Sequence, residues 1–330
     1  MASFSQFGND LYTGKRSFDF VGKKRIWFTI AIIGVLAAIV IPFLRGGFVF
    51  GIEFSGGSEF TVSQPSSLDQ GLAVDAVTGV VPNATARVSV VNNGDAIRVQ
   101  TDLVESSEAD DIRDAMAAAY DVPVDQVTSS FIGATWGADI TRQAVTALIV
   151  FLVLVAAVMA LYFRTWKMSL AAIVALLHDL IITAGVYGIL GFEVTPAAVI
   201  GFLTILGYSL YDTVVVFDKI RENTAEGTSR TFAESVNLAV NQTLVRSINT
   251  SIVALLPVGS ILFVGAVLLG AGTLRDISLA LFIGILVGTY STIFIASPLY
   301  AWLRQGETIV RKDDKKKTAV ASRATSGAVR

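Results

Sequence analysis

The chain has 330 residues, of which 53% are hydrophobic and only 16% are charged. Soluble globular proteins average roughly 25% charged residues, so this small share of charge cannot cover the surface of a soluble domain of this size. The absence of cysteine excludes disulfides, iron–sulfur clusters and thiolate zinc sites, and the lone histidine, His178, excludes a histidine-rich metal centre. We therefore expect a chain that lies mostly in lipid and needs no cofactor or metal.

Six apolar runs are each long enough to cross a bilayer, which takes about 20 residues of helix. Every run is bordered by charged or turn-forming residues. In chain order the runs are 26–44, 144–163, 168–192, 196–217, 242–270 and 277–303. This pattern predicts an α-helical membrane protein with six spans.

Lysine and arginine are concentrated in segments 1–25, 164–167, 218–241 and 304–330, on one side of the predicted spans. Because excess positive charge stays in the cytoplasm, both termini are expected there. The long segment 45–143 then faces outward. A polybasic tail next to a span is typical of contact with anionic membrane lipid, and we favour that reading over nucleic-acid binding.

Segment 45–143 is long enough to fold by itself. Hydrophobic periodicity predicts its strands and helices, Asn93-Gly94 predicts a hairpin turn, and Ser107 is the expected cap of the second helix. The predicted strands are 58–62, 85–91, 96–101 and 124–131, and the predicted helices are 67–80 and 107–120. This β-α-β-β-α-β order is ferredoxin-like. Without histidine, cysteine or a nucleophile elbow, the segment is expected to bind or to move rather than to catalyse, and a passive role is the alternative.

Asp212 and Arg246 stand inside the fourth and fifth runs, where ionisable residues are costly and are functional candidates. At 1.5 Å of helix rise per residue, Asp212 lies roughly 9 Å and Arg246 roughly 6 Å from the cytoplasmic boundary. These depths allow an ion pair if the two helices are neighbours. The alternatives are that Arg246 extends to the interface and that Asp212 has a purely structural role.

His178 and Asp179 lie near the middle of the third run, roughly 15 Å from its cytoplasmic end. Adjacent helix positions point about 100° apart, so we expect the two side chains to face different neighbours. Histidine is the side chain that most readily changes charge near neutral pH, which makes His178 a candidate proton relay. A hydrogen-bonded packing role is the alternative.

Glycines within the spans predict close approach between helices. Gly201 and Gly207 stand in the fourth run, and Gly284 and Gly288 are spaced as G-x-x-x-G in the sixth. We expect these four positions to serve association with a second six-span subunit. Without a second subunit, a six-span half-transporter would leave polar faces of its spans exposed to lipid.

Four stretches are similar to motifs of one known family. They are Gly51–Gly57, His178–Thr183, Gly207–Asn223 and, at the expected separation, Asn241–Ser251. The signature positions within them are Gly51, Phe54, Gly56, Gly57, Gly207, Tyr211 and Asp218. On these motifs the chain resembles the SecF subunits of the bacterial SecDF protein-export complex, which belong to the RND superfamily.

The resemblance implies an α-helical polytopic membrane protein: a six-helix RND-type transmembrane bundle with one extracytoplasmic ferredoxin-like α+β domain. It implies a multi-pass protein of the bacterial plasma membrane that, with SecD, uses the proton motive force to promote translocation of secretory polypeptides through the SecYEG channel. It also implies that Asp212 and Arg246 belong to the proton pathway. His178 and Asp179 are our further candidates for that pathway.

Two positions depart from the family pattern: Tyr211 stands where many members have Asn, and Ala134 stands where a Pro commonly precedes the second span. One rival interpretation is half of another RND-type proton-driven exporter, with a small molecule or lipid as substrate. The other is an intramembrane enzyme, but Asp179 and Asp212 differ in depth by roughly 7 Å, too far to share a proton. We therefore expect no enzymatic activity.

Overall fold

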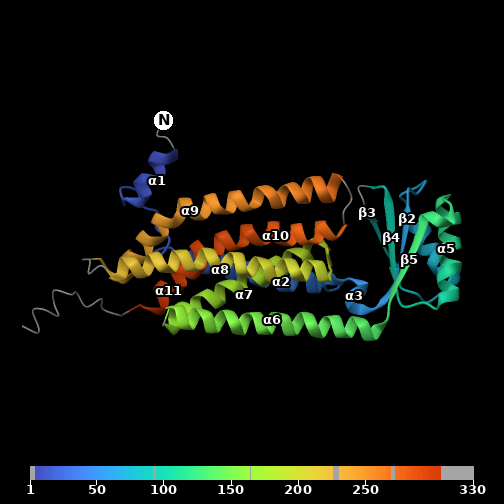
Figure 1. The fold of residues 1–330 in the computed structure, drawn as a ribbon, viewed down its shortest axis with the longest axis horizontal. Coiled ribbons are helices and arrows are strands. Elements are labelled where there is room, and N and C mark those ends of the chain that lie inside the picture. Colours follow the sequence, from blue (N-terminus) through green and yellow to red (C-terminus); the bar gives the residue numbers. More distant parts are fainter. Residues whose placement is uncertain (1–3, 92–93, 164, 226–229, 269–271, 306–330) are drawn as a thin grey trace, which may run out of the picture.

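The computed structural model describes residues 4–91, 94–163, 165–225, 230–268 and 272–305. A bundle of long helices occupies most of the molecule, and a sheet with two helices stands at one end of it (Figure 1). We call this the domain end of the bundle and the opposite end the far end. The predicted hairpin position Asn93 and the basic tail from residue 306 onward lie outside the described residues.

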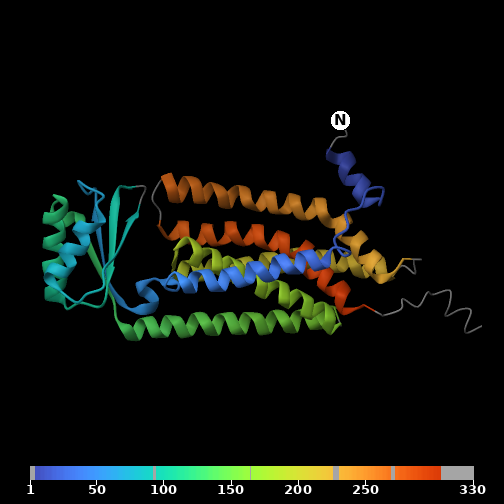
Figure 2. The ribbon, with the colours of Figure 1, turned by 180° about the vertical axis from the view of Figure 1, so that it is seen from behind.

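Six stretches of helix within the described residues are long and apolar enough to cross a membrane. Two of them continue through π-helical turns, η3 and η4. They are α2 (Lys24–Leu44), α6 (Ala134–Phe163), α7 (Trp166–Leu190), α8 (Pro196–Ala225), α9 (Phe232–Ser260) with η3 (Ile261–Leu268), and α10 (Gly272–Ser291) with η4 (Thr292–Ala296) and α11 (Ser297–Leu303). A shorter helix, α1 (Phe4–Tyr12), lies at the far end near the start of α9 (Figures 1 and 2).

Several of these helices extend beyond the apolar runs that predict them. The helix α6 begins at Ala134 and α9 at Phe232, each well before its apolar run. The start of α9 is fixed by a capping box, in which the Thr231 hydroxyl accepts from the Glu234 backbone N–H and the Glu234 carboxylate accepts from the Thr231 N–H. Hydropathy marks the part of a helix that lies in hydrocarbon, whereas backbone hydrogen bonding continues into the polar interface.

The sheet at the domain end contains β2 (Gly57–Ser63), β3 (Arg87–Val91), β4 (Ala96–Thr101) and β5 (Val127–Ile132) in the order β3-β4-β2-β5. All neighbouring strands are antiparallel. Helices α4 (Gln70–Val80) and α5 (Ser106–Tyr120) cover one face, over a core that includes Phe60, Ile97 and Met116. This confirms the predicted ferredoxin-like arrangement. We call residues 57–132 the α+β domain.

Most element starts in this domain differ from the prediction by one to three residues, and two of these differences have a clear local cause. The helix α5 is capped by Glu105 and Glu108 rather than by Ser107, because the Glu105 N–H donates to the Glu108 carboxylate at 2.9 Å. The last strand begins at Val127, since Val124–Gln126 forms a 3-10 turn (η2). Both differences shift an element by a few residues and leave the topology unchanged.

A small junction that the sequence did not predict connects the domain to the bundle. Strand β1 (Val49–Phe50), just after α2, pairs in parallel with β6 (Glu193–Val194), between α7 and α8. A one-turn helix, α3 (Ile52–Ser55), follows β1 and leads into the sheet. Gly56 follows α3 with φ of 73°, a left-handed conformation that favours glycine.

Glycines set the closest helix contacts inside the bundle. A Cβ on Gly201 would meet Ala280, one on Gly284 would meet Ile205, and one on Gly288 would meet Ser209. All three contacts join α8 to α10 within this chain. Gly207 is different, since no atom lies within 4 Å of the position its Cβ would occupy. Of the four glycines predicted to meet another subunit, only Gly207 is therefore free to do so.

Candidate functional site

Buried polar side chains from α7, α8 and α9 gather in the interior of the helix bundle. Asp179 is 1% exposed and Asp212 is 8% exposed. Ser209, Thr213 and Ser247 are buried beside them. Because polar groups in hydrocarbon require internal partners, the hydrogen bonds of this cluster determine what it can do.

Asp212 on α8 is bonded to α9. Its Oδ1 atom accepts a hydrogen bond from the Ser247 hydroxyl at 2.8 Å. Its Oδ2 atom is buried and has no hydrogen-bond partner among the described residues. A buried carboxylate with one oxygen unpaired is unstable in its charged form, because desolvation penalises the charge. Asp212 Oδ2 is therefore a carboxylate oxygen of this cluster without a hydrogen-bond partner among the described residues.

Arg246 does not form the predicted ion pair with Asp212. Its side chain is exposed, and Nη2 donates to the Tyr211 hydroxyl at 3.4 Å. The helices are neighbours, as the depth estimate requires, but consecutive residues of a helix point about 100° apart. Ser247 faces inward to Asp212, so Arg246 faces outward beside Tyr211. The site thus has an inner pair, Asp212–Ser247, and an outer pair, Tyr211–Arg246.

His178 and Asp179 contact each other as well as different helices. His178 Nδ1 and Asp179 Oδ1 lie 3.1 Å apart. Asp179 Oδ2 accepts from the Ser209 hydroxyl on α8 at 2.5 Å, and the His178 ring lies 6.0 Å from that of Tyr290 on α10. Both carboxylate oxygens of Asp179 therefore have a partner, whereas in Asp212 only Oδ1 has one. No hydrogen bond joins Asp179 directly to Asp212.

Hydroxyl side chains that the sequence reasoning missed complete the cluster. Thr213 and Thr292 lie 3.0 Å apart between α8 and η4, and Ser251 on α9 bonds to Thr289 on α10. Thr292 begins the π-helical turn η4, and such turns are frequent at functional sites. A search for serine and threonine one helical turn from Asp212 would have found Ser209.

The signature positions at the domain end lie in and around α3, where the chain passes close to other backbone segments. Gly51 precedes α3, and Phe54 lies within it. A Cβ on Gly56 would lie 3.1 Å from the Ala134 Cα, and one on Gly57 would lie 2.5 Å from the Thr101 carbonyl oxygen. These glycines let the chain pass closely between the α+β domain and the start of α6.

Of the remaining signature residues, Tyr211 and Gly207 lie on the outer face of α8, and Asp218 lies toward its far end. Tyr211 is 59% exposed. The Asp218 carboxylate accepts a hydrogen bond from the Tyr162 hydroxyl on α6 at 2.8 Å. Asp218 thus ties α6 to α8 outside the buried cluster.

A second polar cluster joins the α+β domain to the bundle. Glu193, in β6, accepts from Gln100 in β4 at 2.6 Å and lies 3.5 Å from Arg98. Arg98 also lies 3.6 Å from Glu59 of β2. Burial raises the pKa of Glu193, with Gln100 and Arg98 opposing that rise. We call Glu59, Arg98, Gln100 and Glu193 the junction cluster.

Glu53 lies next to this cluster, in α3. Its Oε2 atom is buried and has no hydrogen-bond partner in the described part of the chain. Burial is also the main cause of the raised pKa of Glu53. The junction therefore brings the carboxylates of Glu53, Glu59 and Glu193 close to the guanidinium of Arg98.

Comparison with known proteins places this geometry in a family. Residues 112–306 match the family described as "Protein export membrane protein SecD/SecF, C-terminal". The protein translocase subunit SecF of Streptomyces coelicolor is 42% identical over 99% of this chain and 87% of its own length. That of Mycobacterium tuberculosis strain CDC 1551 is 44% identical over 97% of this chain and 74% of its own length.

A solved structure agrees with these relatives. The crystal structure of SecDF, a translocon-associated membrane protein from Thermus thermophilus, matches with a TM-score of 0.75 and 31% identity. The match covers 88% of this chain but only 39% of the SecDF chain, so this chain spans about two fifths of that protein. Together these matches show that the chain belongs to the SecD/SecF family of protein export membrane proteins.

Proposed function

We propose that this chain is a SecF-type translocase subunit that acts with SecD. In this proposal it uses the proton motive force to promote passage of secretory polypeptides through the SecYEG channel, on the outer side of the bacterial plasma membrane. The names of the relatives, protein translocase subunits SecF and SecDF, support this function. Both termini are cytoplasmic in the proposal, and the α+β domain faces outward. No step of it requires enzymatic catalysis.

The need for SecD is supported by the exposed face of α8 and α9. Tyr211, Arg246 and Asn249 are exposed there, and Gly207 is open to close approach. Polar side chains within a span normally face protein rather than lipid, and small residues allow helices to meet closely. A second subunit on this face would supply partners for these groups and would bring new charges near the outer pair.

Proton coupling is assigned to Asp212, and the single observation that carries the assignment is its unpaired, buried Oδ2. The neutral acid avoids the cost of a buried charge in this position, whereas the carboxylate requires a second partner. Movement of Arg246 from Tyr211 toward Asp212 would provide that partner. The charge of Asp212 is thus linked to the relative position of α8 and α9.

The test is replacement of Asp212 with asparagine, which keeps the size and removes the titratable group. Export of a labelled secretory precursor is followed in cells whose own copy of this chain is depleted. We expect Asp212→Asn to lower export to the level of depleted cells while membrane insertion and SecD binding persist. Asp139→Asn, an exposed position on α6, is the matched control and should export at the normal rate.

Wild-type export by Asp212→Asn would overturn the assignment and leave His178 and Asp179 as the candidates. The same assay separates the rival function. Half of a small-molecule or lipid exporter would leave precursor export unchanged when the whole chain is depleted. A SecF-type subunit would not.

A further inference from the structure

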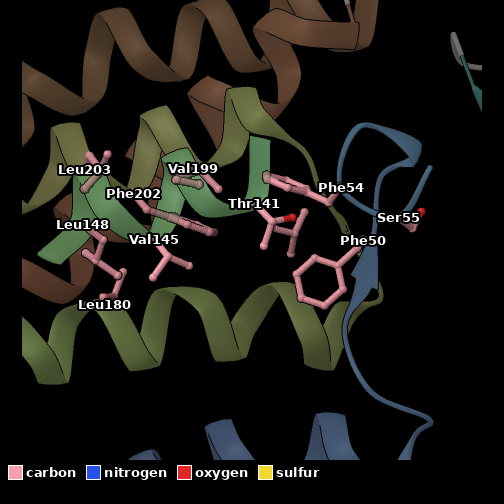
Figure 3. A pocket seen from close by; sticks show the side chains of 12 residues that line it. Phe50, Phe54, Ser55, Thr141, Val145, Leu148, Leu180, Val199, Phe202 and Leu203 are labelled. Carbon is pink, nitrogen blue, oxygen red and sulfur yellow. The ribbon is translucent and has the colours of Figure 1, made fainter. Parts of the chain in front are cut away.

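An apolar pocket of about 400 Å³ opens between α6, α7, α8 and the junction, near the domain end of the bundle. Phe50 and Phe54 lie at one end of it, and Leu148, Leu180 and Leu203 lie at the other (Figure 3). Its volume is within the range of pockets that hold small ligands. The family signature residue Phe54 is therefore part of a pocket wall.

The pocket exists because α6 is anchored to the rest of the chain at two separate places. Near its start, Gly137 packs against α3, where an added Cβ would lie 2.6 Å from the Phe54 carbonyl oxygen. Toward its far end, Val155, Met159 and Phe163 are buried in the bundle. No residue of α6 between these anchors, 138–154, is buried. Over this stretch the helix is therefore packed less closely against the bundle, with Leu148 and Phe151 only partly buried against its core.

The surroundings decide what can fill the space. Almost all of the lining is apolar, so water would find too few polar partners to occupy it. The walls also continue directly into exposed apolar side chains of α6, among them Val145 and Ile149. These side chains face the hydrocarbon of the membrane, so the pocket is continuous with the lipid interface. Within the hydrocarbon of the membrane, the group available to fill an apolar opening is the acyl chain of a lipid.

We propose that this pocket is a binding site for one acyl chain of a phospholipid in the leaflet next to the α+β domain. The polar groups around it fit a lipid that enters from that side. Ser55 and Thr141 are the two hydroxyl side chains of the lining, at the end near Phe50 and Phe54 (Figure 3). Arg142 follows Thr141 in α6 and is exposed, so a cation stands at the depth along α6 where the phosphate would lie.

The bound chain would replace the missing contacts between the two anchors of α6. Atoms that line an empty space lose dispersion contacts on that side, and an acyl chain restores them. It would also contact Phe54 and so connect the membrane to the segment that carries the α+β domain. The site is thus a place where lipid supports the junction.

The test uses photoreactive lipid and the full chain together with its membrane partners. Phosphatidylglycerol with a diazirine midway along one acyl chain is incorporated into membranes, irradiated, and the adducts are mapped by mass spectrometry. We expect adducts on Leu148 and Leu203. Ala144→Trp fills the pocket and should lower the yield at these residues by about 10-fold, as a tenfold change in affinity would. Ala147→Trp, exposed on the same helix and outside the pocket, is the matched control.

A second pair of variants covers the case in which the tryptophan of Ala144→Trp turns away from the pocket and does not fill it. Val199 lines it from α8, whereas the next residue, Ile200, is 57% exposed. Val199→Trp should repeat the loss, and Ile200→Trp should not. Equal labelling of pocket and exposed residues in the wild type, with no loss in either filled variant, would overturn the proposal. Cross-links at Leu148 to a polypeptide instead of lipid would also overturn it and would assign the pocket to a protein partner.

Discussion

Replacing Gly284 with alanine is expected to loosen the contact between α8 and α10, whereas the same change at Gly207 is not. A Cβ on Gly284 would lie 2.9 Å from the Cβ of Ile205, closer than real Cβ atoms approach. The Ile205 Cβ is fixed to the backbone and cannot rotate away, so the helices must separate. Overpacking of this kind costs about 1–3 kcal/mol.

Gly207 is the control because its added methyl group would meet no atom within 4 Å. Both changes gain the same helix propensity, about 1 kcal/mol, so the difference between the two variants isolates the packing cost. Thermal unfolding of the full chain in detergent should place Gly284→Ala about 2–10 °C below Gly207→Ala. Equal melting temperatures would show that α8 and α10 are not tightly packed at Ile205.

Two further predictions concern the junction and the α+β domain. Burial raises the pKa of Glu53 above its ordinary value of 4.5, so its stabilising contribution is present at lower pH and is lost as pH rises through the raised value. Glu53→Gln should therefore reduce the fall in melting temperature between acidic and alkaline buffer, and an unchanged fall would contradict this. Residues 57–132, expressed alone, should give a mixed α/β circular dichroism spectrum and cooperative unfolding, because the core of this domain lies within those residues. An unfolded spectrum would show that the bundle is required for the domain to fold.

The α+β domain could be predicted from the sequence because its signals are local. Strand alternation and helix periodicity each extend over enough residues to be recognised, and their order determines a known topology. The β1–β6 pair could not be predicted, since each strand has only two residues and the partners are far apart in the chain. Residues 134–143 of α6 were also missed, because they are too polar to belong to an apolar run.

The sequence predicted how far along each helix the residues of the candidate site lie, but not the direction in which their side chains point. Counting residues along a helix gives a position along its axis, and this placed Asp212 and Arg246 at similar depths in α8 and α9, which are neighbours in the structure. It does not say which way a side chain points. A rotation of about 100° between consecutive residues is enough to exchange Arg246 for Ser247 as the partner of Asp212. The partner of a buried charge depends on how neighbouring helices pack together, and the sequence of one span does not determine this.

The buried site and the α+β domain are connected by α8 itself. From Asp212 to Thr195, just before α8, is about 26 Å along the helix axis. The Thr195 hydroxyl donates to the Asp276 carboxylate at 2.8 Å, which ties this end of α8 to α10. Two residues earlier, Glu193 accepts from Gln100 of the α+β domain. Because a packed helix moves as a unit, a shift of α8 at Asp212 reaches the junction cluster through a continuous helix, and no additional moving element is needed.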